Sequence, residues 1–173
     1  MQGYPHPIIA REGWPFLAIA VAAAGAVEVF FGGWVATPFW LAALFVLQFF
    51  RDPAREVPGD PQAVLSPADG RVLVAGPAIA GAAPDGRWNQ ISIFLSPMNV
   101  HVNRVPVSGR VTGVRYMPGR FLPAYHKDAA ATNERCEITI DHDGQLVVAR
   151  QVVGMLARRV VCRVQKGAVV RAG

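Results

Sequence analysis

Hydrophobic positions follow two different patterns along the chain. Two nearly continuous apolar runs come first, Trp14 to Phe31 and residues 34–50, and only Gly32-Gly33 lies between them. A helix of 18 residues is about 27 Å long at about 1.5 Å per residue, close to the thickness of the hydrocarbon core of a bilayer. The pattern predicts a helical hairpin that either crosses a membrane as two short spans or enters it and returns.

Beyond the hairpin, prolines and then short β-branched runs replace the continuous apolar pattern. Pro53, Pro58, Gly59 and Pro61 interrupt any further helix. The runs that follow predict strands at residues 71–75, 90–95, 110–117, 136–140, 146–153 and 159–164. Turn residues lie between them at 69–70, 84–86, 107–109 and 141–144, whereas residues 121–133 form a long polar segment, which we interpret as a functional loop.

These patterns predict a mainly β protein preceded by a hydrophobic helical hairpin. Residues 152–173 alternate β-branched runs with a Lys166-Gly167 turn, as in lipoyl- and biotinyl-type domains. We therefore expect a β-sandwich or barrel-like domain with elements of that kind. The expected division is a membrane-anchoring hairpin at 1–52, a linker at 53–64 and a β-rich domain at 65–173.

Charge separates the same two parts of the chain. Residues 1–50 hold three charged side chains, Arg11, Glu12 and Glu28, whereas residues 51–173 hold 16 Lys and Arg against 10 Asp and Glu. A basic domain beside an apolar anchor favours an anionic lipid surface, and its dispersed charges lack a nucleic-acid-binding signature. Arg11 precedes the hairpin, and Arg51 and Arg55 follow it. The positive-inside rule therefore predicts an inner-membrane protein whose soluble domain is cytoplasmic.

The sequence argues against a signal peptide, a buried helical hairpin and a cysteine-based metal site. The first run lacks the arrangement of a cleavable signal peptide, because a second run follows it almost at once. If the hairpin were buried inside a soluble protein, only residues 51–173 would remain to cover it. Cys136 and Cys162 form neither a CxxC pair nor a metal-ligand cluster, so we expect buried free thiols and no metal.

Three polar stretches carry candidate chemistry: LSPADGRV at 65–72, FLSPMNVHVNRVPVSGRV at 94–111 and NER at 133–135. Alone, Asp69-Gly70 is an ordinary hairpin turn, and His101 is an ordinary histidine on a half-buried strand. Together they lie between FFRDP at 49–53 and VVGMLARRVV at 152–161. In this order the five motifs resemble the short, bacterial and archaeal type of phosphatidylserine decarboxylase, and the likeness covers nearly the whole chain.

The resemblance implies a pyruvoyl enzyme that converts phosphatidylserine into phosphatidylethanolamine and CO2. In that family a proenzyme cuts itself at a Gly-Ser bond, and the new pyruvoyl group forms a Schiff base with the substrate amine. This chain contains no Gly-Ser pair. It is therefore expected to correspond to the large β subunit, with the pyruvoyl group on a separate small α subunit. A homo-oligomer of αβ units is compatible with the sequence.

The resemblance also assigns roles to two residues. Asp69 matches the carboxylate that assists self-cleavage. His101 matches the first histidine of the YHRxH motif of long-type members, where an imidazole protonates the reacting carbon or binds the substrate carboxylate. The second histidine of that motif is replaced here by Arg104, so the processing base is either His101 or another group. Arg104 is either a phosphate or carboxylate ligand or a structural ion-pair partner.

Further candidates for substrate contact are Asn103, Phe121, His126, Asn133 and Glu134. For Asn133-Glu134-Arg135, a buried Glu-Arg pair that holds the loop is the competing interpretation. His126 is either a solvated loop histidine or part of a gate over the lipid headgroup.

Two other functions fit parts of the sequence. One is a membrane-tethered β-sandwich protein without catalysis that binds a lipid or acts as an adaptor. The other is a pyruvoyl decarboxylase of a soluble amino acid, although the hairpin argues against a soluble substrate.

Overall fold

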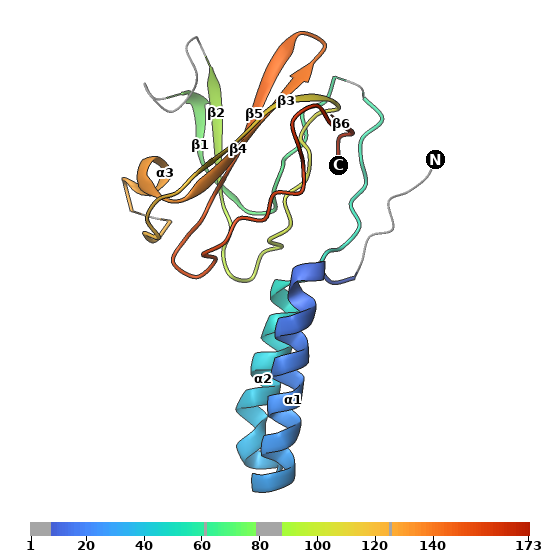
Figure 1. Ribbon diagram of the computed structural model, residues 1–173, viewed down its shortest axis with the longest axis vertical. Coiled ribbons are helices and arrows are strands. Elements are labelled where there is room, and N and C mark those ends of the chain that lie inside the picture. Colours follow the sequence, from blue (N-terminus) through green and yellow to red (C-terminus); the bar gives the residue numbers. More distant parts are fainter. Residues whose placement is uncertain (1–7, 61, 79–87, 125) are drawn as a thin grey trace. The chain divides into compact units, whose positions relative to one another are not determined.

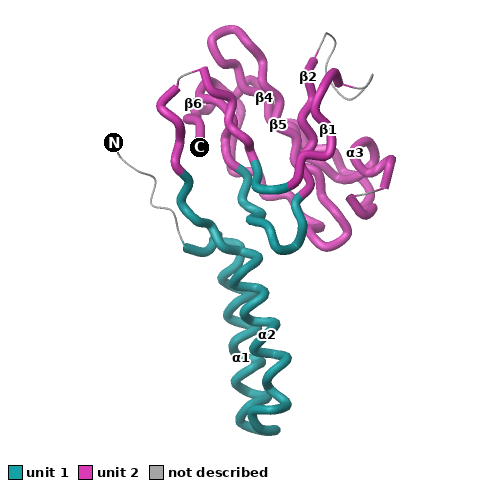
Figure 2. Tube along the Cα trace, turned by 180° about the vertical axis from the view of Figure 1, so that it is seen from behind, with its two compact units in different colours: residues 1–55, 68–70, 95–103 teal, residues 56–67, 71–94, 104–173 magenta. Residues whose placement is uncertain are grey.

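The computed structural model describes residues 8–60, 62–78, 88–124 and 126–173 (Figure 1). Contacts divide the chain into two compact units, which Figure 2 distinguishes by colour. The first, called here the hairpin unit, comprises residues 1–55, 68–70 and 95–103. The second, called here the sheet unit, comprises residues 56–67, 71–94 and 104–173. Two short loops of the predicted β-rich domain therefore belong to the hairpin unit.

The hairpin unit contains the two predicted helices. A short 3-10 turn, Arg11–Gly13, leads into α1, Trp14–Phe31, and α2, Gly33–Phe49, follows after one residue. That residue, Gly32, has a φ of +86°, a conformation that glycine adopts without the steric cost of a Cβ atom. Each predicted helix end lies within one residue of the observed one, because Gly32 interrupts an otherwise uniform apolar pattern.

Small residues lie between the two helices, and large apolar residues point outward. Ala24, Ala36 and Ala43 are buried, which lets the helix backbones approach closely, as small residues do between membrane helices. In contrast, Phe30 and Trp34 are 78% and 95% exposed. The segment Arg11–Phe31 is long and apolar enough to cross a membrane, and α2 is somewhat shorter. The exposure of the large side chains agrees with lipid contact and disagrees with a buried core hairpin.

The base of the hairpin is closed by the segments that enter and leave it. Ala10 N–H donates to Phe50 O at 2.8 Å, and Asp52 N–H donates to Ile8 O at 2.9 Å. The rings of Phe16 and Phe50 stack with centroids 5.5 Å apart. These contacts hold the last turn of α2 in place, which is important for the site described below.

The sheet unit is mainly β, as predicted. Its four-stranded antiparallel sheet has the order β5-β4-β3-β6, and a separate antiparallel pair is formed by β1 and β2. Register shifts in β1 and β3 mark local bulges, which bend the strands. The strands are β1 Arg71–Pro77, β2 Asn89–Phe94, β3 Gly109–Met117, β4 Arg135–His142, β5 Gln145–Val152 and β6 Val169–Val170.

An aliphatic cluster forms the core of the sheet unit. Val107, Val111 and Ile140 are almost fully buried, and Val105, Val164 and Val170 pack against them. The β4–β5 hairpin turns at Asp143 and Gly144, both with positive φ, and this turn confirms the prediction at residues 141–144. The core therefore lies where the start of β3 and the end of β4 pack against residues 164–170.

One expectation about secondary structure was wrong. The predicted strand at 159–164 is absent, and the late strand is instead β6, two residues that pair with Gly109 and Arg110 of β3. β-branched composition favours a strand only where a partner strand lies in register, and the β3 edge is taken by β6. The polar segment 121–133 contains a short helix, α3, Ala129–Thr132. The turn predicted at 84–86 lies outside the described residues.

Candidate active site

The loop that carries His101 is fastened to the last turn of α2. Within this loop, Asn99 Oδ1 accepts hydrogen bonds from both the backbone N–H and the hydroxyl of Ser96, each at 2.8 Å, and forms a tight turn. The turn presents the carbonyl oxygen of Met98, which accepts from Gln48 Nε2 at 3.3 Å and from an Arg51 guanidinium nitrogen at 3.0 Å. The end of the apolar hairpin therefore determines where this loop lies.

The imidazole of His101 is half-buried and stacks on an aromatic ring of the same helix end. Its centroid is 4.1 Å from that of Phe49, with 23° between the ring planes. His101 Nδ1 lies 3.0 Å from the carbonyl oxygen of Asn99, which can only accept, so Nδ1 carries the proton and donates it. Nε2, which has no hydrogen-bonding partner among the described residues, is then the nitrogen with the free lone pair.

The surroundings of His101 favour its neutral form. Burial lowers the pKa of His101 below its ordinary value of 6.5, the bond to Asn99 O partly opposes this, and the positive charge of Arg51 lowers it further. A neutral imidazole with Nδ1 occupied can accept a proton at Nε2 and later return it. His101 therefore has the protonation state that a proton-transfer group needs.

Asp69 also belongs to the hairpin unit, in the bend that precedes β1. Its carboxylate pairs with the guanidinium of Arg55, which follows the hairpin along the chain. Both side chains keep close to half of their surface exposed, at 40% and 45%. The structure thus groups Asp69 and His101 in one compact unit. Asp69 pairs with Arg55, and the positive charge of Arg51 acts on His101.

Arg104 lies in the sheet unit, beside the last residues of the chain. Its backbone N–H donates to Pro67 O at 2.8 Å, and a guanidinium nitrogen lies 3.5 Å from Gly173 O. Gly173 N–H in turn donates to Val105 O at 2.9 Å. Asn103, the residue before Arg104, is exposed. The segments 65–67 and 104–106 and the chain end therefore lie side by side.

Asn133 is completely buried, and its side chain holds three backbone groups. Its amide nitrogen donates to Leu122 O and to Val153 O, both at 2.9 Å, and its amide oxygen accepts from Leu122 N–H at 3.0 Å. The side chain thereby connects the loop after β3 to the end of β5. In this arrangement Asn133 acts as an internal clamp, and its polar atoms are already used within the chain.

The neighbouring charges pair differently from the Glu-Arg pair expected in this motif. Glu134 accepts a hydrogen bond from the hydroxyl of Tyr116, which raises the pKa of that tyrosine. Glu137, and not Glu134, is the carboxylate near Arg135, at 3.9 Å, and it forms a closer pair with Arg150 at 2.6 Å. Glu137 pairs with Arg150 because the two residues lie opposite each other on β4 and β5.

The two remaining candidates lie on the exposed part of the same loop. Phe121 is 39% exposed, and the guanidinium of Arg158 lies over its ring at 5.7 Å. His126 is also exposed, and its Nδ1 accepts from Asp128 N–H at 3.2 Å. Both belong to the sheet unit and lie outside the unit that holds His101.

Three contacts around the candidate site residues were not predicted from the sequence. Phe49, Arg51 and Arg55 lie within or just after the FFRDP motif, yet nothing in that motif indicates that they touch His101, the Met98 carbonyl and Asp69. The signal that would have found them is their position next to the apolar run, since aromatic residues and arginines are typical of the ends of such runs.

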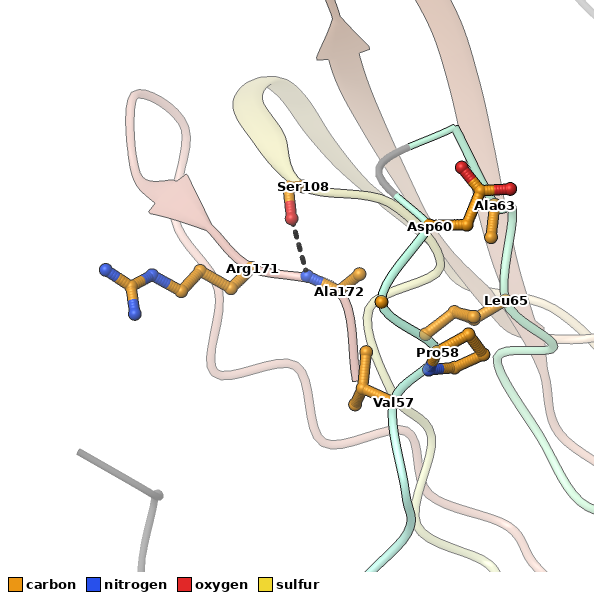
Figure 3. A pocket seen from close by; sticks show the side chains of 9 residues that line it. Val57, Pro58, Asp60, Ala63, Leu65, Ser108, Arg171 and Ala172 are labelled. Carbon is orange, nitrogen blue, oxygen red and sulfur yellow. Dashed lines mark hydrogen bonds between the residues drawn. The ribbon is translucent and has the colours of Figure 1, made fainter. Parts of the chain in front are cut away.

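A shallow cavity of about 240 Å³ is present in the sheet unit, and Figure 3 shows its walls. Ala172 N–H donates there to the hydroxyl of Ser108 at 3.0 Å, and the guanidinium of Arg171 extends away from the other labelled residues. None of the predicted site residues lines it. Among the described residues there is also no group of three or more His, Cys, Asp and Glu side chains suited to a metal ion.

Comparison with known proteins agrees with the motifs. A family model described as phosphatidylserine decarboxylase matches residues 42–173. The chain is 49% identical to the phosphatidylserine decarboxylase proenzyme of Ralstonia pickettii, over 98% of this chain and 79% of that protein. It is 46% identical to the proenzyme of Cupriavidus taiwanensis, over 96% and 77%, and 47% identical to that of Burkholderia ambifaria, over 96% and 78%. The chain therefore belongs to the phosphatidylserine decarboxylase family of enzymes.

Proposed function

We propose that the chain is the large subunit of a decarboxylase that converts phosphatidylserine into phosphatidylethanolamine and CO2 at the inner face of the cell membrane. The observation that carries this proposal is the half-buried, neutral imidazole of His101 at the base of an apolar hairpin. A lipid substrate remains in the bilayer while its headgroup reacts, so a proton-transfer group is needed at the membrane surface.

The reaction breaks the bond between the serine Cα and the carboxylate, and a proton replaces the CO2 on that carbon. The electron pair released by this cleavage needs an acceptor, which a pyruvoyl carbonyl on a small partner subunit would supply when present. The residues here fit such a group, because Nε2 of the neutral His101 has no partner in the part of the chain that the structure describes, and the positive charge of Arg51 acts nearby. His101 would accept a proton from the substrate ammonium at Nε2 and return it to Cα.

The proposed role of Asp69 belongs to the formation of the two subunits. The carboxylate is held by Arg55, and it would orient or deprotonate the serine that cleaves the proenzyme. Asp69→Asn should therefore accumulate uncut protein, which gel electrophoresis detects. Efficient cleavage of this variant would exclude the role.

For the remaining candidates, the geometry supports separate proposals. Asn103 and Arg104 lie two and three residues after His101 in the chain, and a guanidinium suits a phosphate or carboxylate of the headgroup. Phe121 and His126 are accessible for contact with substrate. The buried side chain of Asn133 and the Glu134–Tyr116 bond instead support a role in shaping the loop.

The experiment that tests the proposal compares the wild-type holoenzyme with its His101→Gln variant on phosphatidylserine liposomes. The variant should be cleaved into subunits and recovered in the membrane fraction, yet release little CO2. Equal activity would exclude His101 as the proton-transfer group. Uncut variant protein would show that His101 serves self-cleavage, a stage before the one proposed here.

Substrate class is tested in the same preparation. Because the imidazole lies at the end of an apolar hairpin, phosphatidylserine in a bilayer should be decarboxylated and free serine should not. Comparable turnover of free serine would indicate a decarboxylase of a soluble amino acid.

A further inference from the structure

The aromatic ring beneath the imidazole of His101 has no assigned role. We propose that Phe49 is a positioning residue for decarboxylation, which fixes the His101 imidazole on the last turn of the membrane hairpin. This inference rests on the proton-transfer role proposed above for His101. Phe49 itself acts through His101 and does not touch the reacting atoms.

The stack on His101 is the closest ring contact that Phe49 makes. Its centroid lies 4.1 Å from that of His101, compared with 5.0 Å from Phe50 and 6.1 Å from Phe45. The ring planes of Phe49 and His101 are also nearly parallel, at 23°, whereas the other two pairs are edge-on or tilted. One face of the imidazole is therefore covered by Phe49.

Two constraints together define the direction of Nε2. The stack fixes the plane of the imidazole, and the bond from Nδ1 to Asn99 O fixes its rotation within that plane. Nε2, on the opposite side of the ring from Nδ1, is then aimed in one direction. Proton transfer requires that such an atom lie within hydrogen-bonding reach of its partner, so free rotation of the ring would slow the transfer.

The loop around His101 is tied to the same helix end at a second point. Gln48 and Arg51 both donate to the carbonyl oxygen of Met98, three residues before His101. Phe49 lies between these two donors in sequence. Three of the four residues 48–51 therefore contact the His101 loop. The position of the imidazole thus depends on the end of the hairpin.

The ring of Phe49 also contributes to the environment that keeps His101 neutral. Burial is the main cause of the lowered pKa of His101, and Phe49 covers part of that surface. Among the described residues, Arg51 is the charged side chain that acts on the pKa of His101, and a change at residue 49 leaves it in place. Loss of the ring should therefore move the acidic limb of the activity profile to higher pH, toward 6.5.

The test uses three substitutions in the holoenzyme. Phe49→Leu removes the ring and keeps an apolar side chain, and Phe49→Trp keeps a stacking ring. Phe45→Leu is the matched control, because it removes the same atoms one turn earlier on α2, where Phe45 does not stack on His101. Each protein is assayed for phosphatidylethanolamine formation on phosphatidylserine liposomes from pH 5 to pH 8, roughly the range in which histidine titrates.

Phe49→Leu should lower kcat by about 10- to 100-fold with a nearly unchanged KM, and it should shift the acidic limb upward. Phe49→Trp and Phe45→Leu should resemble wild type. Equal kcat and pH profile in Phe49→Leu and Phe45→Leu would overturn the inference while the wild-type activity stands. A wild-type protein that forms no phosphatidylethanolamine would instead refute the proposed function.

Folding is followed separately by subunit cleavage and by recovery in the membrane fraction. If Phe49→Leu fails either criterion, Phe49→Met replaces it, since an unbranched thioether fills irregular space without a ring. A cleaved, membrane-bound Phe49→Met protein with wild-type kcat and pH profile would also overturn the inference.

Discussion

Replacement of Asn133 by alanine should destabilise the sheet unit strongly. The side chain is fully buried and makes three hydrogen bonds to the backbone of Leu122 and Val153. A buried hydrogen bond contributes about 1 kcal/mol net, so Asn133→Ala should cost about 3 kcal/mol. A folded domain of this kind is stable by only about 5–15 kcal/mol, so the loss is a large fraction of the total.

The assay is thermal unfolding of the cleaved protein in detergent micelles, followed by near-ultraviolet circular dichroism. At about 2–4 °C per kcal/mol for a chain of this size, the expected decrease in Tm is about 6–12 °C. Asn103→Ala is the matched control because Asn103 is exposed, and its Tm should change little. Asn133→Asp should be at least as damaging as Asn133→Ala, since a buried carboxylate cannot donate to the two carbonyl oxygens.

The outcome also separates a clamp from a substrate ligand. A clamp predicts that Asn133→Ala has a lower Tm and, well below that Tm, a KM close to that of wild type. An unchanged Tm with a raised KM would exclude a clamp and assign Asn133 to substrate binding.

Three further predictions concern other parts of the molecule. Gly119→Ala should lower Tm because a Cβ atom there would collide with the backbone of residues 132–134. Gly59→Ala should not lower Tm, because a Cβ atom there would meet nothing within 4 Å. Equal Tm values for the two variants would contradict this packing. The acidic limb of kcat/KM should lie below pH 6.5, because folding lowers the pKa of His101 and the active neutral form therefore persists to lower pH; a limb above 6.5 would contradict this. Burial raises the pKa of Cys136 to about 11, so iodoacetamide at neutral pH should label Cys162 first. Peptide mass spectrometry that finds Cys136 labelled first would exclude a buried environment for Cys136.

Much of the fold could be predicted because its signals are local. Helix α1 ends at Phe31 because an uninterrupted apolar run meets Gly32-Gly33, and the β4–β5 turn follows from Asp143-Gly144. The strand expected at 159–164 was wrong because pairing depends on which edge is available, and this is not encoded in composition. The sequence likewise could not indicate that β6 would pair with the start of β3.

The candidate site was predictable to a smaller extent. Motif resemblance pointed to Asp69 and His101, and both lie in the hairpin unit. The contacts of His101 with Phe49 and of Asp69 with Arg55 join residues 52 and 14 positions apart, so only the folded chain reveals them. The same applies to Glu137, which pairs with Arg150 through strand register.

Decarboxylation of phosphatidylserine is tested most directly by lipid mass spectrometry of phosphatidylserine liposomes incubated with the purified, cleaved protein. Phosphatidylserine should decrease and phosphatidylethanolamine with the same acyl chains should increase by an equal amount, while His101→Gln leaves the lipid unchanged. Phosphatidylserine that persists unaltered in the presence of correctly cleaved, membrane-bound wild-type protein would contradict the proposed decarboxylation.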